Sequence, residues 1–240
     1  MAIKPILFNT EMVRAILDGI KTCTRRICKD ANECTVPDME FYNADKRTYA
    51  VHNFADKEQM EQLSIAERTC PICPGDTLYV RETVWQKIGY YLDIDGETKP
   101  SWYNEFKYVA SDEKPETGWN YSWAKRPSIH MPKEAARIWL KVMDVRVERL
   151  QEIDEDGVWD EGFKFKPPCL TRVSADGYTC ELDGPCMSSI KYCDMTMGEL
   201  FGRELWNSTI KKSDLDRYGW DANPYVWAIS FERCEKPEDE

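Results

Sequence analysis

The segment ARIWLKVMDVRVERL, at residues 136–150, constrains the fold most. Its β-branched and apolar residues predict one long strand, which must lie in a sheet because its backbone N–H and C=O groups need partners. Two other segments, GDTLYVRETVW at 75–85 and NPYVWAISFE at 223–232, alternate between apolar and polar residues and are also typical of strands. The chain therefore needs a β-rich core.

Two helices are expected between these strands. Residues 11–18 carry apolar side chains at helical spacing, with Thr10 in the position of an N-cap and Gly19 in that of a C-terminal stop. A second short helix is predicted at MGELFGRELWNS, residues 197–208. Strands separated by helices and long loops predict an α+β fold with a mixed, curled sheet or a small barrel.

Three polar, irregular stretches interrupt this core, at about residues 28–70, 86–125 and 163–195. They hold most of the Asp, Asn, Pro and Gly residues, and none has an evident apolar core. We interpret them as insertions in a single domain that spans residues 1–240.

The net charge limits the partners. Lys and Arg number 32 and Asp and Glu 43, so the formal charge is −11, which opposes non-specific binding to a polyanion. A small uncharged nucleoside or base fits this charge better than a long duplex, although a basic patch could bind RNA locally. Without a signal-peptide pattern or an apolar run of about 20 residues, we expect a cytoplasmic protein with no membrane partner.

The ten cysteines are expected to be reduced thiols in that compartment. Cys70 and Cys73 have metal-ligand spacing and could form a structural zinc site with Cys28 and Cys34. A second possible set is Cys169, Cys180, Cys186 and Cys193. Because the spacing between the pairs is irregular, no metal or cofactor is predicted.

The stretch GIKTCTRR, which follows the first predicted helix, concentrates cations and hydroxyls. One interpretation is a solvent-exposed basic edge strand. The other is a bend that gathers the Lys21 amine and the hydroxyl of Thr22 or Thr24 in one pocket. A lysine can take the proton of a threonine only if burial or a cationic neighbour, here Arg25 or Arg26, lowers its pKa.

Three further features are candidates for a site. The acidic run LQEIDEDGVWDEG, at 150–162, is mostly a solvated face, but a turn at Gly162 could direct Glu161 inward. Ser128 and His130 lie in a proline-bounded loop that could form a substrate rim. Aromatic rings in or beside loops, which could stack on a base, are those of Trp85, Trp119, Trp123 and Trp159.

Four segments in this order, ILDGIKTCTRR, PGDTLYVRET, VERLQEIDEDGVWDEG and NPYVWAISFE, resemble the ASCH family of the PUA-like superfamily. With KRPSIHMPKEAARIWLKV between them, the chain is similar to the long form encoded by phages and prophages. The most specific part is the pattern G-x-K-x-x-T-x-R at Gly19, Lys21, Thr24 and Arg26. The resemblance implies a small mixed β-barrel with flanking helices and three insertions, and it favours the bend over the exposed strand.

Some small ASCH proteins are bacterial N4-acetylcytidine amidohydrolases, which remove the acyl group from the exocyclic amine of cytidine. The resemblance implies a catalytic group of Lys21, Thr24 and, by alignment of the acidic run, Glu161. It implies no metal. The residues expected to bind the substrate are Arg26, Arg81, Glu82, Trp85, Ser128 and His130.

Two other functions stay open. The first is a non-catalytic module for RNA or a modified base, in which phosphate or base edges contact Lys21, Arg25, Arg26, Arg81 and Arg126. The second is a ribonuclease, for which the sequence marks no general base.

Overall fold

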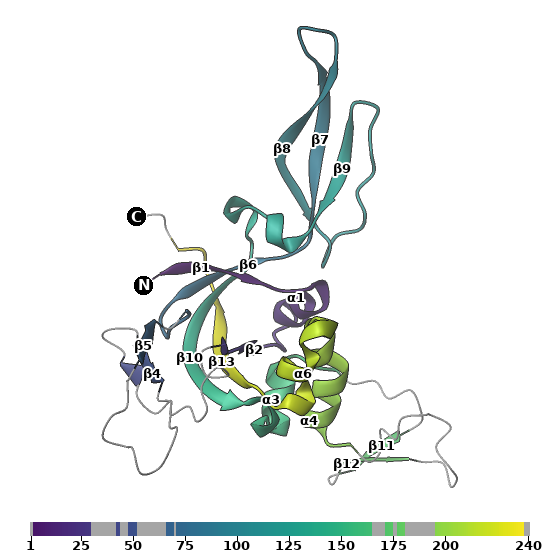
Figure 1. Cartoon of the computed structure of the whole chain (residues 1–240). Coiled ribbons are helices and arrows are strands. Elements are labelled where there is room, and N and C mark those ends of the chain that lie inside the picture. Colours follow the sequence, from purple (N-terminus) through teal and green to yellow (C-terminus); the bar gives the residue numbers. More distant parts are fainter. Residues whose placement is uncertain are drawn as a thin grey trace. The chain divides into compact units, whose positions relative to one another are not determined.

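The protein has a mixed α+β fold in its computed structural model (Figure 1). The structure describes residues 2–29, 42–43, 48–51, 66–69, 71–164, 171–174, 177–180 and 195–237. Five strands form one mixed sheet in the order β1 (Ile3–Leu7), β6 (Thr77–Arg81), β10 (Trp139–Arg149), β13 (Tyr225–Cys234) and β2 (Cys23–Ile27). The predicted α+β class, with a mixed sheet, is confirmed. Among the described strands, no sheet closes into a barrel.

The pairing within this sheet follows the predicted strands. β1 runs parallel to β6, β10 runs antiparallel to β6, and β2 runs antiparallel to β13. In β6 and just beyond it, Leu78, Val80 and Glu82 are buried, as their shared face predicts. The charged Glu82 is therefore part of the interior.

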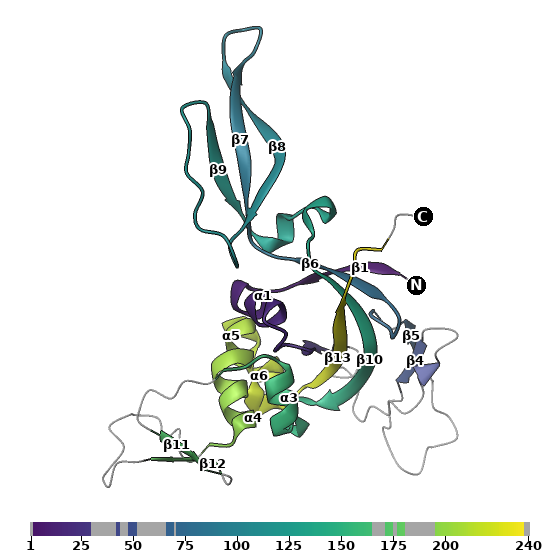
Figure 2. The same cartoon turned by 180° about the vertical axis from the view of Figure 1, so that it is seen from behind.

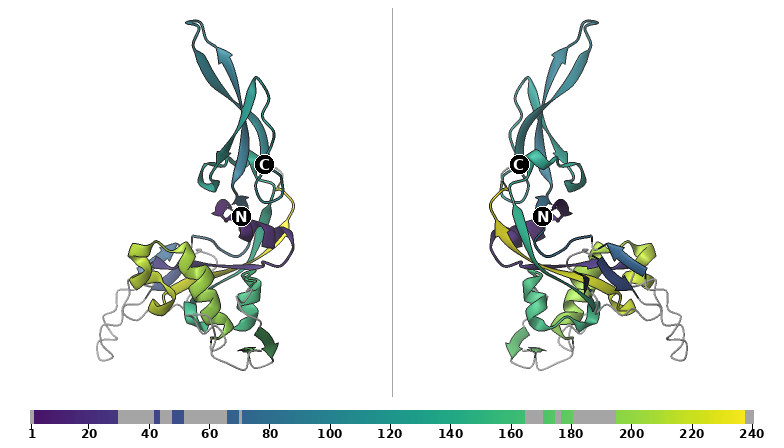
Figure 3. Two further views of the ribbon diagram at one scale, coloured as in Figure 1. Left: turned by 90° about the vertical axis from the view of Figure 1, so that its right-hand side faces the viewer. Right: turned by 90° about the vertical axis from the view of Figure 1, so that its left-hand side faces the viewer.

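The second predicted insertion, residues 86–125, is not irregular. It forms most of a three-stranded antiparallel sheet in the order β8 (Thr98–Tyr108), β7 (Val84–Leu92) and β9 (Tyr121–Arg126). The prediction was wrong because one face of this sheet carries exposed lysines and aromatic residues, so its strands do not show a regular apolar stripe. The pairing of β7 with β8 also has a register shift between Gln86 and Ile88, where β8 contains the additional residues. Figure 3 shows the twist of β7 and β8 about each other.

The other two insertions contain short strands: β3 (Tyr42–Asn43), β4 (Thr48–Val51), β5 (Ala66–Thr69), β11 (Thr171–Ser174) and β12 (Gly177–Cys180). The remainder of both insertions lies outside the described residues. Of the first possible zinc set, Cys34 and Cys70 also lie outside the described residues. Cys28 and Cys73 are described, and both are buried. The side chains of the second cysteine set are not among those described. In the described part of the chain, no group of three or more His, Cys, Asp or Glu residues is placed to hold a metal ion.

Helix α1 (Thr10–Leu17) begins one residue earlier than predicted. Its N-cap is Asn9, whose side-chain oxygen accepts the Met12 N–H at 2.8 Å, and Thr10 is the first helical residue. Its end is as predicted, because Gly19 has a φ of +72° and closes the last turn.

The predicted helix near the C-terminus is confirmed as three consecutive helical segments: α4 (Met197–Leu200), the π-helical η6 (Phe201–Trp206) and α5 (Asn207–Thr209). Two other short helices, α3 (Glu155–Asp160) and α6 (Leu215–Tyr218), lie beside them in Figure 2. Gly202 has no room for a side chain, since a Cβ there would lie 2.1 Å from the Trp220 ring. Residues of α3, α4 and η6 pack together in one apolar cluster, which includes Leu150, Val158, Leu200, Phe201, Trp206 and Trp220. This cluster anchors α3.

The chain divides into two compact units. The first contains residues 1–20, 74–143 and 231–240, and the second contains residues 21–73 and 144–230. The strands β10 and β13 each contribute residues to both. Among the described helices, none is both long enough and apolar enough to cross a membrane.

Candidate active site

The outer edge of β2 is covered by the end of α3, and both elements belong to the second unit. β2 is last in the sheet order and pairs only on one side, with β13. An uncovered strand edge has unpaired backbone groups, so it needs other partners. Here Asp160 supplies two: its carbonyl accepts the Thr22 N–H, and its carboxylate accepts the Thr22 hydroxyl, both at 2.8 Å.

Glu161 points inward because α3 ends in a glycine-stabilised turn. Gly162 has a φ of +74°, and its N–H donates to the carbonyl of Trp159 at 2.8 Å. The next residue, Phe163, donates to the carbonyl of Val158 at 3.4 Å, and both side chains are buried. This pattern of two bonds and an apolar contact is a Schellman motif. It leaves Glu161 buried and the preceding Asp160 exposed, which separates the two neighbouring carboxylates.

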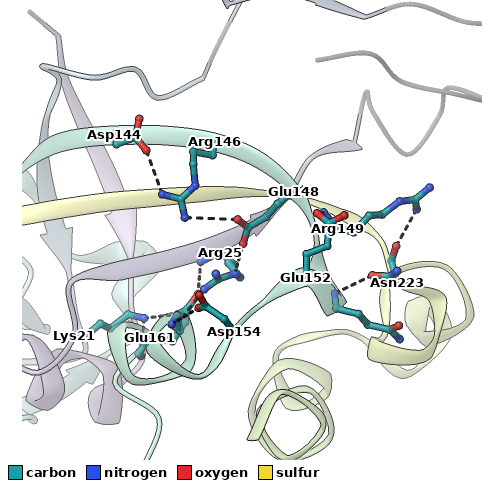
Figure 4. Close-up of polar contacts among 12 residues, drawn as sticks. Lys21, Arg25, Asp144, Arg146, Glu148, Arg149, Glu152, Asp154, Glu161 and Asn223 are labelled. Atoms are coloured by element: carbon teal, nitrogen blue, oxygen red, sulfur yellow. Dashed lines mark hydrogen bonds and ion pairs between the residues drawn. The ribbon is translucent and has the colours of Figure 1, made fainter. Parts of the chain in front are cut away.

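Lys21 and Glu161 form a buried ion pair (Figure 4). Lys21 Nζ donates to Glu161 Oε2 at 2.5 Å, to the Glu161 carbonyl at 2.8 Å and to the Cys23 carbonyl at 2.7 Å. An ammonium group has three protons, so these three acceptors stabilise its charged form. Burial nevertheless lowers the pKa of Lys21, and the Glu161 carboxylate only partly opposes that shift. The amine is therefore easier to deprotonate than a lysine in water.

The ion pair holds the backbone on both sides of Thr24. Lys21 binds the carbonyl of Cys23, and Glu161 Oε1 accepts the Arg25 N–H at 2.6 Å. The peptide groups before and after Thr24 are thus fixed by the two charged partners. Residues Cys23–Ile27 thus form the edge strand of one interpretation, but its expected solvent exposure is wrong, because Cys23, Thr24 and Arg25 are buried. The pocket that would join the Lys21 amine to the Thr24 hydroxyl stays a prediction.

The Thr24 hydroxyl is buried without a partner. Thr24 is 1 % exposed, and its Oγ1 has no hydrogen-bond partner among the described residues. A buried polar group left unpaired costs about 1–3 kcal/mol, and such groups are rare in folded proteins. Among the described residues, Lys21 and Thr24 share no hydrogen bond, so the Thr24 hydroxyl is unpaired at a position closed to solvent.

Arg25 extends the pair into a chain of alternating charges. Its Nη1 lies 3.5 Å from Glu161 Oε1, and its Nε lies 2.7 Å from Glu148 Oε1. Arg146 continues the chain, because its Nη2 lies 3.6 Å from Glu148 Oε2 and its Nη1 lies 3.3 Å from Asp144 Oδ2. Figure 4 shows this row of three acids and three bases, whose formal charges cancel. The exposed fraction of the side chain falls from 53 % at the outer carboxylate to 0 % at Lys21.

The sequence analysis missed the part of this chain that lies on β10. Asp144, Arg146 and Glu148 alternate in sign at a spacing of two residues. On a strand, that spacing places all three on one face. The carboxylates on this face indicated that a buried cation pairs with them. In the structure that cation is Arg25, which pairs with Glu148.

Cys23, adjacent to Thr24, is a poor competing nucleophile. It is 4 % exposed, and burial, followed by the nearby Glu161 charge, raises the pKa of its thiol. A thiol reacts as its thiolate, so this shift makes it inert near neutral pH. Of these two neighbouring residues, Thr24 is therefore the better candidate nucleophile.

Arg26 is half-buried at the same strand edge. Its Nη1 donates to the Arg25 carbonyl at 3.4 Å. Burial lowers the pKa of its guanidinium and Glu161 opposes that shift, but an arginine stays protonated in proteins. It therefore provides a permanent positive charge near Glu161.

The other predicted substrate ligands lie in the first unit. Both carboxylate oxygens of Glu82 accept hydrogen bonds from Arg137, at 2.8 and 3.0 Å, and Glu82 is 1 % exposed. Arg81 donates to the carbonyl oxygens of Met131, at 2.9 Å, and Ile129. These contacts tie β6 to the loop that follows β9.

Trp85 lies on β7, and Ser128 and His130 lie in the short 3₁₀ helix η2 (Ser128–His130). Ser128 is half-buried and His130 is exposed. For these residues, and for Arg81 and Glu82, substrate binding stays a prediction.

A cavity of about 340 Å³ lies elsewhere in the second unit. Its lining residues are Asn207, Leu215, Asp216, Gly219, Trp220, Asp221 and Ala222. None of them belongs to the Lys21–Glu161 pair or to the charge chain.

Gly157 permits the close approach of α3 to Arg25. A Cβ at this position would lie 2.9 Å from Arg25 Nη2 and 2.9 Å from Asp154 Oδ1. We expect Gly157→Ala to lower the free energy of unfolding by about 1–3 kcal/mol, the usual cost of an overpacked buried site. Urea unfolding checks this, with the exposed neighbour change Asp156→Ala as a near-neutral control. A Gly157→Ala protein as stable as the wild type would contradict the tight contact.

The chain was compared with protein-family models, curated proteins and solved structures, and no match was found in any of the three.

Proposed function

We propose that the protein is an amidohydrolase that removes the acyl group from the exocyclic amine of N4-acylcytidine or a related cytosine derivative. The observation that carries this proposal is the arrangement at Thr24. Thr24, whose buried hydroxyl has no partner among the described residues, lies between two peptide groups held by the buried Lys21–Glu161 pair. We further propose that the five-stranded sheet is of the ASCH type within the PUA-like superfamily, as the motif around Lys21 implies.

The reaction begins with a proton shift inside the ion pair. Across the 2.5 Å contact, Lys21 passes one proton to Glu161, which leaves a neutral amine and a neutral carboxyl. The lowered pKa of Lys21 reduces the cost of this step. The neutral amine is then a base for the Thr24 hydroxyl.

Acyl transfer follows. Thr24 Oγ1 attacks the carbonyl carbon of the N4-acyl group while its proton moves to Lys21. The C–N bond then breaks, and the ammonium of Lys21 gives that proton to the leaving amine of cytidine. The acyl group is now an ester on Thr24. Water attacks this ester by the same route, with Lys21 taking its proton and returning it to Thr24, and a carboxylic acid leaves.

Arg26 is the proposed donor to the oxyanion that forms in each tetrahedral intermediate. Its permanent charge lies on the same strand, two residues after Thr24. Loss of one such donor typically lowers kcat by about 10²–10³-fold.

The charge chain favours this proposal over an RNA-binding role for the same residues. Lys21 and Arg25 both lie against the buried carboxylate of Glu161, so neither is an uncompensated cation for a phosphate. For a ribonuclease, the Glu161 carboxylate would repel the phosphate that the general base must approach. A neutral acylated base meets neither obstacle.

The test is turnover of N4-acetylcytidine and N4-benzoylcytidine, followed by the ultraviolet spectrum as cytidine forms. We expect hydrolysis whose rate changes by less than about twofold between 50 and 200 mM salt, because the substrate is uncharged. A binder making several phosphate contacts would lose about 10³-fold in affinity over that range. Absence of turnover of both nucleosides and of their free bases would refute the proposal.

A further inference from the structure

The sheet β8–β7–β9 presents one aromatic and one basic side chain from each strand on a single face. Residues paired across neighbouring strands lie on the same face of a sheet. Trp85 pairs with Lys107 on one side and with Lys125 on the other, and Lys87 pairs with Trp123. We define the aromatic–lysine face by these residues and by the ring beside Lys87: Trp85, Lys87, Tyr103, Lys107, Trp123 and Lys125.

The rings on this face are held in place by their neighbours. Tyr103 lies against Gly89, where a Cβ would come within 2.5 Å of the ring. Lys87 Nζ lies 5.9 Å from the centroid of Tyr103 and 6.0 Å from that of Trp123, and Lys125 Nζ lies 5.8 Å from that of Trp85. These are cation–π distances. The face is therefore an ordered surface of alternating rings and charges.

This face is open, in contrast to the opposite one. Tyr103 is 48 % exposed, Lys107 and Lys125 are exposed, and Trp85 and Trp123 are half-exposed. On the other face, Val84 is buried beneath Met131 and Ala135, with Phe106 and Tyr108 packed beside them. The aromatic rings are thus not explained by the apolar core of this sheet.

The charge of the face is positive in a chain of net charge −11. Lys87 is paired with Glu105 at 2.7 Å. Lys107 and Lys125, on either side of Trp85, have no ion-pair partner among the described residues. The half-exposed indole of Trp85 thus lies between two lysines that have no counter-charge among the described residues, which fits an anionic partner.

The combination of rings and cations discriminates between anionic partners. An acidic peptide would use the lysines but has no regular series of rings next to its charges, and a neutral sugar would use the rings but not the lysines. A duplex has its bases stacked inside. A single strand of nucleic acid offers several bases in a row to stack on aromatic rings and, next to each base, a phosphate for a lysine, which matches the repeat of rings and lysines on this face.

We propose that the aromatic–lysine face binds single-stranded nucleic acid. This proposal does not depend on the proposed chemistry of Lys21, Thr24 and Glu161, although Trp85 is also one of the predicted substrate ligands. Along β7, the side of the strand that carries Trp85 and Lys87 continues to the exposed Tyr91, six residues after Trp85, a span of about 20 Å at the usual rise per strand residue. Oligonucleotides of about ten residues are therefore long enough to cover it.

The test measures fluorescence anisotropy of a labelled ten-residue oligo(U) RNA, the matching oligo(dT) DNA and a ten-base-pair duplex, titrated with the full chain. We expect binding of at least one single strand, with affinity falling as salt rises, and weaker binding of the duplex. A preference for RNA or for DNA identifies the natural source. Equal binding of the duplex and the single strands would overturn the proposal.

Variants separate stacking from simple charge attraction. We expect Trp85→Ala to weaken binding about tenfold, since stacking of one base contributes about 1–3 kcal/mol. Lys107→Gln with Lys125→Gln should lower the slope of log affinity against log salt by about 1.4. The matched controls are the exposed loop residues Trp119→Ala and Lys114→Gln, which should bind as the wild type does.

Folding of each variant is checked by circular dichroism. The lysine changes lie on exposed side chains, so they keep the test decisive even if Trp85→Ala fails to fold. Trp85→Phe, which retains a ring, should recover most of the lost affinity. The proposal would be overturned if the double variant Lys107→Gln, Lys125→Gln bound as tightly as the wild type. It would also be overturned if heparin displaced the oligonucleotide and Trp85→Ala bound it normally.

Discussion

Thr24→Ala is expected to lower kcat for N4-acetylcytidine by about 10⁴-fold or more, the scale of loss when a catalytic nucleophile is removed. The change removes a buried hydroxyl that lacks a hydrogen-bond partner among the described residues. It leaves the Lys21–Glu161 pair intact, because that pair binds the backbone of Cys23 and Arg25 and not the threonine side chain. The measurement is the ultraviolet assay at high enzyme concentration.

Two further changes at the same position make the result specific. Thr24→Ser keeps a hydroxyl and should retain measurable turnover. Thr24→Val keeps the shape without the hydroxyl, so it should be inactive and at least as stable as the wild type, because a buried unpaired hydroxyl is replaced by a methyl group. Turnover by Thr24→Val would remove the nucleophile role. A loss of stability in Thr24→Val would show that the hydroxyl has a structural partner.

Local patterns predicted the parts of this site that depend on neighbouring residues. The helix before Gly19, the strands β6, β10 and β13, and the turn at Gly162 all follow from short-range rules of capping and alternation. The inward direction of Glu161 was predicted from that turn. Even the error at the start of α1 is local, since Asn9 and Thr10 are both good N-caps.

Contacts between distant residues could not be predicted in the same way. The ion pair of Arg25 with Glu148 requires β2 and β10 to lie in one sheet with a particular register, and no short segment specifies that register. The sheet β8–β7–β9 was missed for a different reason. Its rings and lysines form an exposed surface, so its strands lack the apolar alternation that marks a half-buried strand.

Glu161→Gln is expected to lower the free energy of unfolding by about 3–5 kcal/mol, because it leaves the buried Lys21 without its counter-charge. It also replaces the acceptor of the Arg25 N–H with a weaker one. The matched control is Asp156→Asn, on the exposed face of the same acidic run, which should change stability by less than about 0.5 kcal/mol. Urea unfolding followed by tryptophan fluorescence measures both.

The same variant has a diagnostic pH dependence. Burial lowers the pKa of Lys21 below its unfolded value of 10.5, so the folded state binds fewer protons than the unfolded state between those two values. Stability must then rise with pH across that window. Without the Glu161 charge, the pKa of Lys21 in the folded state falls further. The pH range over which the free energy of unfolding rises therefore extends toward neutral pH. The stability gap between Glu161→Gln and the wild type should therefore narrow from pH 7 to pH 9.

A double-mutant cycle with Lys21→Met assigns the effect to the pair. When both charges are removed, neither is left buried alone, so Lys21→Met with Glu161→Gln should be more stable than the sum of the single losses predicts. Purely additive losses, or a gap between Glu161→Gln and wild type that does not change with pH, would mean that Lys21 does not bear its charge against Glu161. In that case the proton shift that activates Thr24 has no donor–acceptor pair, and the proposed chemistry would be wrong even though the fold is unchanged.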